Sequence, residues 1–130
     1  MGPVWGRRAV PLAGLVAGGV LLSGGAATSS PYLAAVALAL STAAVLSVEG
    51  PFWATMLAMA GRRSGTAGGI MNMGSNLGGA ISPALTPVLA AAIGWENALH
   101  AAAAVSIVAG LLWLGVVPQS NLLGELEPRR

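Results

Sequence analysis

The 130-residue sequence has no cysteine, a single histidine and few charged residues, which make up 8% of the chain. Without cysteine, disulfides, thiolate metal sites and cysteine nucleophiles are excluded. His100 alone cannot supply the several ligands of a zinc or haem site, so no metal and no cofactor is expected. A soluble domain carries roughly 25% charged residues. This chain has too few to cover a globule in water, and its expected solvent is lipid.

The positive charge is carried by arginine alone, because lysine is absent. A net charge of +2 and a pI of about 10.6 are values that nucleic-acid-binding proteins also show. Here, however, the six arginines form three pairs at predicted helix ends and make no continuous basic face. The sequence therefore predicts no nucleic-acid partner.

Apolar sequence is abundant: 55% of the residues are hydrophobic and the mean hydropathy is +0.78. Four apolar segments end at Gly, Pro or charged residues and are long enough to cross a bilayer as helices. The predicted fold is an all-α membrane protein with four transmembrane helices at about residues 9–25, 32–60, 66–93 and 98–117, a cytoplasmic N-terminal segment at 1–8 and a cytoplasmic tail at 118–130. Gly50-Pro51 predicts a kink in the second helix near Pro51.

The arginines indicate the orientation of these helices. The pairs Arg7-Arg8, Arg62-Arg63 and Arg129-Arg130 all fall on one side if the chain crosses four times, and the opposite loops contain no basic residue. The positive-inside rule then predicts a multi-pass protein of the cell (inner) membrane with both termini in the cytoplasm. The N-terminal run also resembles a signal peptide, but the segments that follow it are equally apolar.

Glu49 lies inside an apolar segment, where inserting a carboxylate costs about 2.5–3.5 kcal/mol. We therefore expect it to face a cavity or a partner, or to be protonated. At about 100° per residue, one helix stripe holds Glu49 together with Thr42, Trp53 and Met56. The structural alternative is that Glu49 satisfies backbone groups that Pro51 leaves without a hydrogen bond.

A second polar stripe runs along the third segment. At about 100° per residue, this stripe contains Gly68, Asn72, Ser75, Gly79, Ser82 and Thr86, with Asn76 on its margin. Two amides one turn apart are suited to bind the hydroxyls or carboxylates of a solute, but asparagine also forms hydrogen bonds between helices. The repeats Gly65-xxx-Gly69 and Gly74-xxx-Gly78 favour close approach of a neighbouring helix.

No enzyme motif is present. The sequence lacks a nucleophile elbow, a phosphate loop, metal-ligand spacing and a nearby acid–base pair, so we predict no catalytic residue and no enzyme activity. Trp5, Trp95 and Trp113 lie near predicted helix ends, as interfacial anchors do. We interpret His100, one turn inside a helix, as a satisfied polar residue near the interface.

Three motifs stand in order along the chain: EGPFWA (49–54), GRRSGTAGGIMNMGSNLGGAISP (61–83) and GWENALH (94–100). Together they resemble the C-terminal end of major facilitator superfamily transporters, in the anion:cation symporter group of sugar-acid carriers such as hexuronate, glucarate and galactonate permeases. The resemblance spans most of the chain and is strongest from Glu49 to Trp113. It would make these helices the ninth to twelfth of the family.

The resemblance implies a carrier of twelve helices in two halves, with alternating access around a central site. It implies substrate-binding positions at Trp53 on the tenth-like helix and at Asn72 and Asn76 on the eleventh-like helix, and Glu49 and Phe52 belong to the same motif. It also implies a small organic anion, such as a sugar acid, carried together with a proton. The carboxylate-binding arginines and main proton-carrying acids of the family lie in the N-terminal half.

Four helices cannot form both sides of such a carrier. The resemblance therefore implies a C-terminal fragment that is inactive without the N-terminal transporter helices as its partner. Two alternatives stay open. Four-helix multidrug exporters act as dimers, but they use a glutamate in their first helix, whereas Glu49 lies in the second segment. A non-transporting membrane subunit would use the same helix faces for docking.

Overall fold

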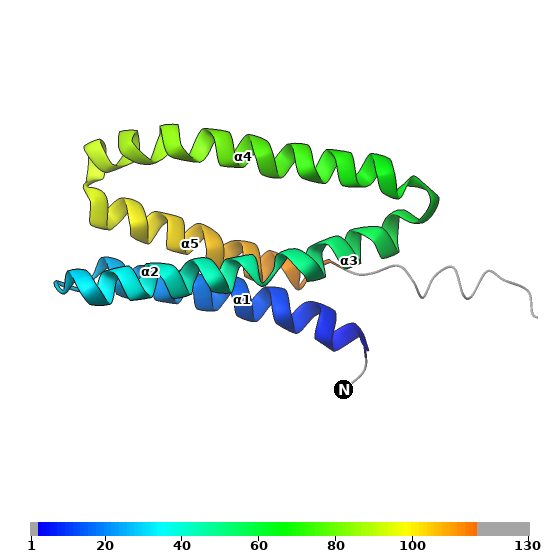
Figure 1. Ribbon diagram of the computed structural model, residues 1–130, viewed down its shortest axis with the longest axis horizontal. Helices are drawn as coiled ribbons and strands as arrows, with labels where there is room; N and C mark the ends of the chain where they lie inside the picture. Colours follow the sequence, from blue (N-terminus) through cyan, green and yellow to red (C-terminus); the bar gives the residue numbers. More distant parts are fainter. Residues whose placement is uncertain (1–2, 117–130) are drawn as a thin grey trace, which may run out of the picture.

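The computed structural model describes residues 3–116, with side chains described from residue 9 onward. The described chain forms the helices α1 (Pro3–Ala26), α2 (Pro31–Leu46), α3 (Glu49–Ala60), η1 (Gly61–Arg63), α4 (Ser64–Ile93) and α5 (Trp95–Trp113). In Figure 1, α1, α2 and α5 lie together on one side and α4 runs along the other. The predicted tail, residues 118–130, lies outside the described residues, as does the side chain of Trp5.

Three described stretches are long and apolar enough to cross a membrane: Ala9–Ala26, Pro31–Ile93 and Trp95–Trp113. The middle stretch is not one straight helix, because the chain reverses at η1 and α4 returns alongside α3 (Figure 1). The all-α class with long apolar helices that the composition predicted is therefore found.

The second predicted segment is divided into α2 and α3 at Ser47 and Val48. Pro51, the third residue of α3, has no N–H to donate to the carbonyl of Ser47, and its ring crowds that carbonyl. Helical bonding resumes with the N–H of Phe52, which donates to the carbonyl of Val48 at 3.1 Å. The bend therefore lies one turn before the proline, and Glu49 is the first residue of α3.

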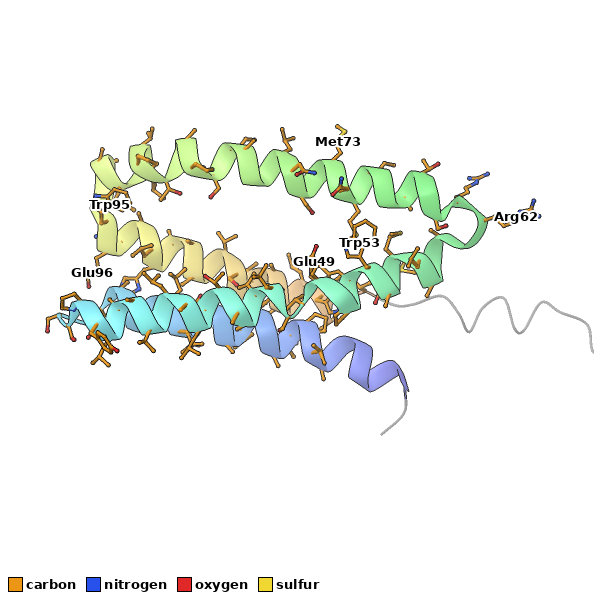
Figure 2. All side chains as sticks on the ribbon, viewed as in Figure 1. Glu49, Trp53, Arg62, Met73, Trp95 and Glu96 are labelled. Atoms are coloured by element: carbon orange, nitrogen blue, oxygen red, sulfur yellow. The ribbon has the colours of Figure 1, made fainter. Side chains whose placement is uncertain are left out.

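Two glycines at the ends of helices adopt backbone angles that other residues avoid. Gly61 ends α3 with φ of 49°, and Gly94 joins α4 to α5 with φ of 87°. Both values lie in the left-handed region, where a Cβ would be strained. The first of these turns leads into η1, whose Arg62 and Arg63 are exposed. Figure 2 shows Arg62 at one end of the molecule.

Helix α1 is the centre of the packing, because its small residues let α2 and α5 approach closely. A Cβ placed on Gly18 would lie 2.6 Å from Val45 Cγ2 on α2. One placed on Gly19 would lie 2.8 Å from the carbonyl oxygen of Ala103 on α5. The hydroxyl of Ser41 also donates to the carbonyl of Gly18 at 2.8 Å. These contacts join α1, α2 and α5 into one packed unit.

Helix α4 is more loosely attached, through contacts with α3 and α5. Its glycines at 65, 69, 74 and 78 were predicted to be points of close helix approach. Within the part of the chain that the structure describes, no atom of another element lies within 4 Å of where their Cβ atoms would stand. The predicted close approach is therefore not made among the described residues. Gly78 instead borders a cavity of about 390 Å³ that is also lined by residues of α5.

Candidate functional site

A cavity of about 590 Å³ lies between the α2–α3 bend and the inner face of α4. Glu49, Phe52 and Trp53 line it from α3, and Asn72 lines it from α4. Figure 2 shows Glu49 and Trp53 pointing from α3 into the space beneath α4. The other lining residues are Leu15, Val45, Leu46, Val48, Met71, Ser75 and Gly79. Its size and mostly apolar lining, with a few polar groups, are typical of small-molecule sites.

Glu49 is exposed, and no described residue donates a hydrogen bond to its carboxylate or pairs with it. This bears on the alternative interpretation that Glu49 satisfies backbone groups that Pro51 leaves without a hydrogen bond. The backbone group that Pro51 leaves without a donor is the carbonyl of Ser47, which accepts hydrogen bonds just as a carboxylate does. No bond joins Glu49 to it among the described residues. The carboxylate instead points into the cavity.

The half-buried Trp53 lies where α3 meets α4. A Cβ placed on Gly68 would lie 3.2 Å from Trp53 Cζ3 and 3.4 Å from Met56 Cε, so Gly68 makes room for this contact. Thr42, which shares the predicted stripe with Trp53, does not join the site. It precedes the bend, on α2, and its hydroxyl donates to the carbonyl of Leu38 at 2.9 Å. The bend therefore breaks the predicted stripe.

Phe52 contacts a second aromatic residue as well as the cavity. Its ring lies 4.2 Å from that of Trp113, centroid to centroid, with 30° between the planes. Trp113, predicted to be an interfacial anchor, thus packs onto α3 from α5. The two rings also border a second, apolar cavity of about 510 Å³, whose further lining residues are Thr55, Met56, Met59, Ala60, Ala67 and Met71.

The two asparagines of α4 differ in position. Asn72 lines the cavity, whereas the Nδ2 of Asn76 donates to the backbone carbonyl of Asn72 at 2.9 Å. Ser75 and Gly79 complete the polar inner face. The carbonyl of Gly79 has no helical donor, because the residue four positions on is Pro83. The Ser75 hydroxyl donates to the carbonyl of Met71 at 3.1 Å. This face therefore offers an amide, a hydroxyl oxygen and a backbone carbonyl that lacks its usual helical donor.

The remaining lining residues were not predicted as site residues. Ser75 and Gly79 lie on the predicted polar stripe, so their position followed from periodicity although we assigned them no role. The apolar wall carries no sequence signal, because its residues resemble those of any lipid-facing helix. It consists of Leu15, Val45, Leu46, Val48 and Met71.

His100 lies one turn inside α5, beside Glu96, which Figure 2 shows at the end of the bundle away from Arg62. Its Nδ1 is 2.7 Å from Ser23 Oγ of α1, and its Nε2 is 3.8 Å from a carboxylate oxygen of Glu96. It is thus a satisfied polar residue that links α1 to α5. No group of three metal-ligating side chains occurs among the described residues.

Long apolar helices around a cavity with a few polar groups are typical of membrane proteins that bind a small solute between their helices. The comparison with protein families is more specific: residues 1–128 match the model of the Major Facilitator Superfamily. The chain belongs to this superfamily, and membership implies transmembrane transport of a small molecule rather than an enzyme reaction. Neither a curated protein nor a solved structure matches the chain.

Proposed function

We propose that the chain forms the last four transmembrane helices of a proton-coupled carrier of organic anions such as sugar acids. The cavity is the observation that carries this proposal. It gathers Glu49, Phe52, Trp53 and Asn72, four of the five positions that the resemblance to sugar-acid carriers implies, from two facing helices. The membership of the superfamily supports transport, and the motifs of α3 and α4 favour this substrate class.

The polar groups of the cavity suit a hydroxylated solute. The indole of Trp53 offers a flat apolar face to the carbon skeleton. The amide of Asn72 both donates and accepts hydrogen bonds. The Ser75 hydroxyl donates to the carbonyl of Met71 at 3.1 Å, and its oxygen can still accept a hydrogen bond from a solute. The carbonyl of Gly79, which lacks its helical donor because Pro83 has no N–H, can accept one more. In this proposal Asn76 contributes indirectly, by its bond to the backbone at Asn72.

The topology in the membrane is part of the proposal. Helix α1, the bent pair α2–α3, helix α4 and helix α5 would each cross once, because the chain reverses after each of the first three. The exposed Arg62 and Arg63 would then lie on the same side as both termini. The positive-inside rule makes this side the cytoplasm and the membrane the cell (inner) membrane.

The uncovered inner face of α4 supports further helices as the partner. Asn72, Ser75 and Gly79 line one wall of the cavity, and no atom of another described element lies within 4 Å of a Cβ placed on Gly69, Gly74, Gly78 or Gly79. In a carrier with two halves, the other half closes such a cavity. We infer that the N-terminal transporter helices of this fold take that place.

Expression of the chain with helices one to eight of a sugar-acid carrier of the same family tests the proposal. We expect the pair to take up radiolabelled D-glucuronate, and a protonophore to abolish accumulation. Either part alone should give no uptake. Uptake by the chain alone would contradict the need for partner helices. No uptake by the pair, with both parts present in the membrane, would contradict the proposed function.

A further inference from the structure

The second cavity, of about 510 Å³, lies between α3, the start of α4 and the end of α5. Contacts within the described chain hold its walls together. Gly68 of α4 lies close to the side chains of Trp53 and Met56 on α3. The ring of Phe52 lies 4.2 Å from that of Trp113 and joins α3 to α5. The second cavity is therefore bounded by three helices of this chain.

The lining of the second cavity is almost entirely apolar. Three of its side chains are those of Met56, Met59 and Met71. Methionine is flexible and adapts its shape to irregular apolar partners. Met59 is 51% exposed, so the cavity reaches the surface of the described chain. Its volume falls within the range of about 300–1,000 Å³ that small-molecule sites occupy. These properties suit a flexible apolar chain.

One hydroxyl interrupts this apolar lining. Thr55 is only 3% exposed, and its Oγ1 has no hydrogen-bond partner among the described residues. The helical hydroxyls of Thr42, Ser75 and Thr86 instead donate to the carbonyl four residues before them. A buried hydroxyl that lacks a partner costs free energy, and native proteins rarely leave one in that state. Thr55 therefore indicates a ligand that brings a hydrogen-bond acceptor into the cavity.

Two positive charges stand beside the second cavity. Ala60, the last residue of α3, lines it, and Arg62 and Arg63 follow in η1 with exposed side chains. No described acidic residue forms an ion pair with either arginine. Thr55 precedes Arg62 by seven residues, roughly 10 Å along the chain at 1.5 Å per residue. The same end of the molecule thus presents an apolar cavity, a free hydroxyl and two unpaired cations.

We propose that the second cavity binds an acyl chain of an anionic phospholipid from the surrounding membrane. The apolar chain lies among the methionines, an ester carbonyl accepts a hydrogen bond from the hydroxyl of Thr55, and the phosphate pairs with Arg62 and Arg63. One phospholipid carries all three matching features, and a bilayer supplies it at high local concentration. Basic residues just outside membrane-spanning helices attract anionic lipids. The inference does not depend on which solute is transported.

Mass spectrometry of the intact full chain, released from detergent with equal amounts of phosphatidylglycerol and phosphatidylcholine, tests the charge preference. One phosphatidylglycerol should stay bound in preference to phosphatidylcholine. Arg62→Gln combined with Arg63→Gln should weaken phosphatidylglycerol binding about fivefold for each arginine removed. Arg7→Gln combined with Arg8→Gln is the matched control and should leave binding unchanged. Equal retention of the two lipids, or equal losses in the two double variants, would overturn the proposal.

The hydroxyl is tested by Thr55→Val, which keeps the branched shape of the side chain. It should weaken phosphatidylglycerol binding about threefold to tenfold, the effect of one hydrogen bond. The preference over phosphatidylcholine should persist, because both lipids carry ester carbonyls. Thr42→Val removes a hydroxyl that bonds to the carbonyl of Leu38 instead, and should bind as the wild type does. Thr55→Ser, which keeps a hydroxyl, should also bind lipid. Unchanged binding in Thr55→Val would contradict the proposal.

The position of the lipid is tested with phosphatidylglycerol that carries a photoreactive diazirine on its acyl chain. Cross-links should fall on peptides that contain Met56, Met59 or Met71. Cross-links confined to α1 and α2 would overturn the proposal. The tail is the competing occupant, and deletion of residues 118–130 should leave lipid binding as it is. Binding that appears only after this deletion would show that the tail fills the second cavity, and would likewise overturn the proposal.

Discussion

Asn72 and Asn76 stand one turn apart on α4, yet only the first reaches the cavity. Each residue of a helix rotates the direction of the side chain by about 100°. A residue four positions further on therefore points about 40° away from the first. This rotation takes Asn76 off the cavity face, and its amide turns back to the carbonyl of Asn72 at 2.9 Å. Two residues of the same type in one motif therefore have different surroundings.

Asn72→Ala is expected to lower D-glucuronate uptake by the assembled carrier about tenfold, the effect of losing roughly 1.4 kcal/mol of hydrogen bonding to the solute. Asn76→Ala is the matched control, and its loss should be at most about threefold, because it removes one bond to the backbone. Initial rates at equal membrane expression measure both. Equal losses in the two variants would contradict the assignment of Asn72.

Glycines in α1 offer a test of the packed unit. Gly19→Ala should destabilise the purified chain by about 1–3 kcal/mol, the usual effect of overpacking. The reason is that the new methyl group would lie 2.8 Å from the carbonyl oxygen of Ala103, a backbone atom that cannot move aside. Gly24→Ala is the control, since open space surrounds that position. Thermal unfolding in detergent compares them, and similar melting temperatures would refute this packing.

Much of this picture follows from the sequence, and the rest depends on tertiary structure. Composition predicts the all-α membrane class, and the motif predicts that Glu49, Trp53 and Asn72 belong together. Periodicity alone could not separate Asn72 from Asn76, because that depends on how α4 is rotated toward α3. Nor could it place Trp113 against Phe52, because their contact joins helices distant in sequence.

At the scale of elements, α4 presents two different faces. Asn72, Ser75 and Gly79 lie on the inner face toward the cavity. Met73, 70% exposed, points outward from the molecule (Figure 2). An exposed side chain of a membrane-spanning helix can face either lipid or a cavity inside the protein, and the two faces of α4 differ in this way.

Cysteine labelling distinguishes these two faces, and the chain has no cysteine of its own to interfere. In the chain expressed in membranes, Ser75→Cys should react with a water-soluble maleimide, because this position lines the cavity. Met73→Cys should stay unlabelled, because lipid covers the outer face. Mass shifts after a fixed reaction time report both. Labelling at the two positions to the same extent would show that α4 is rotated differently.

The α2–α3 bend also determines which residues line the cavity. The sequence predicts a kink near Pro51, and the structure places it at Ser47 and Val48. The proline acts on the carbonyl four residues before it, so its effect appears one turn upstream of its own position. The bend makes Glu49 the first residue of α3, and both Glu49 and Trp53 then line the cavity.

At the scale of the whole molecule, α1, α2 and α5 form the packed unit and α4 stands apart from it (Figure 1). Helices α1 and α5 run antiparallel, since Leu15 meets Gly110 while Ser23 meets His100. This unit supplies part of the cavity wall through Leu15, Val45 and Leu46. The site is thus built between a packed support and a separate helix.

A disulfide tests this arrangement. The pair Leu15→Cys and Gly110→Cys should cross-link α1 to α5 on mild oxidation, because a Cβ on Gly110 would lie 3.1 Å from that of Leu15. Disulfides need about 3.5–4.5 Å, so a small separation of the helices suffices. The control pair Gly24→Cys and Gly110→Cys should not form, since Gly24 lies roughly 14 Å further along α1. A gel shift with thiol-reactive polymer counts the free thiols, and cross-linking of both pairs would contradict the packing.

Helix α4 is contacted by α3 at one end and by α5 at the other (Figure 1). A helix that is held only at its ends bends most easily near its middle. The middle of α4 carries Gly74, Gly78 and Gly79, and none of them has a close neighbour among the described residues. Pro83 and Pro87 remove two backbone bonds that would stiffen its second half. Sideways bending of the midpoint widens or narrows the cavity while both end contacts stay in place. Bending of α4 would therefore change the width of the cavity, because Asn72, Ser75 and Gly79 form one of its walls.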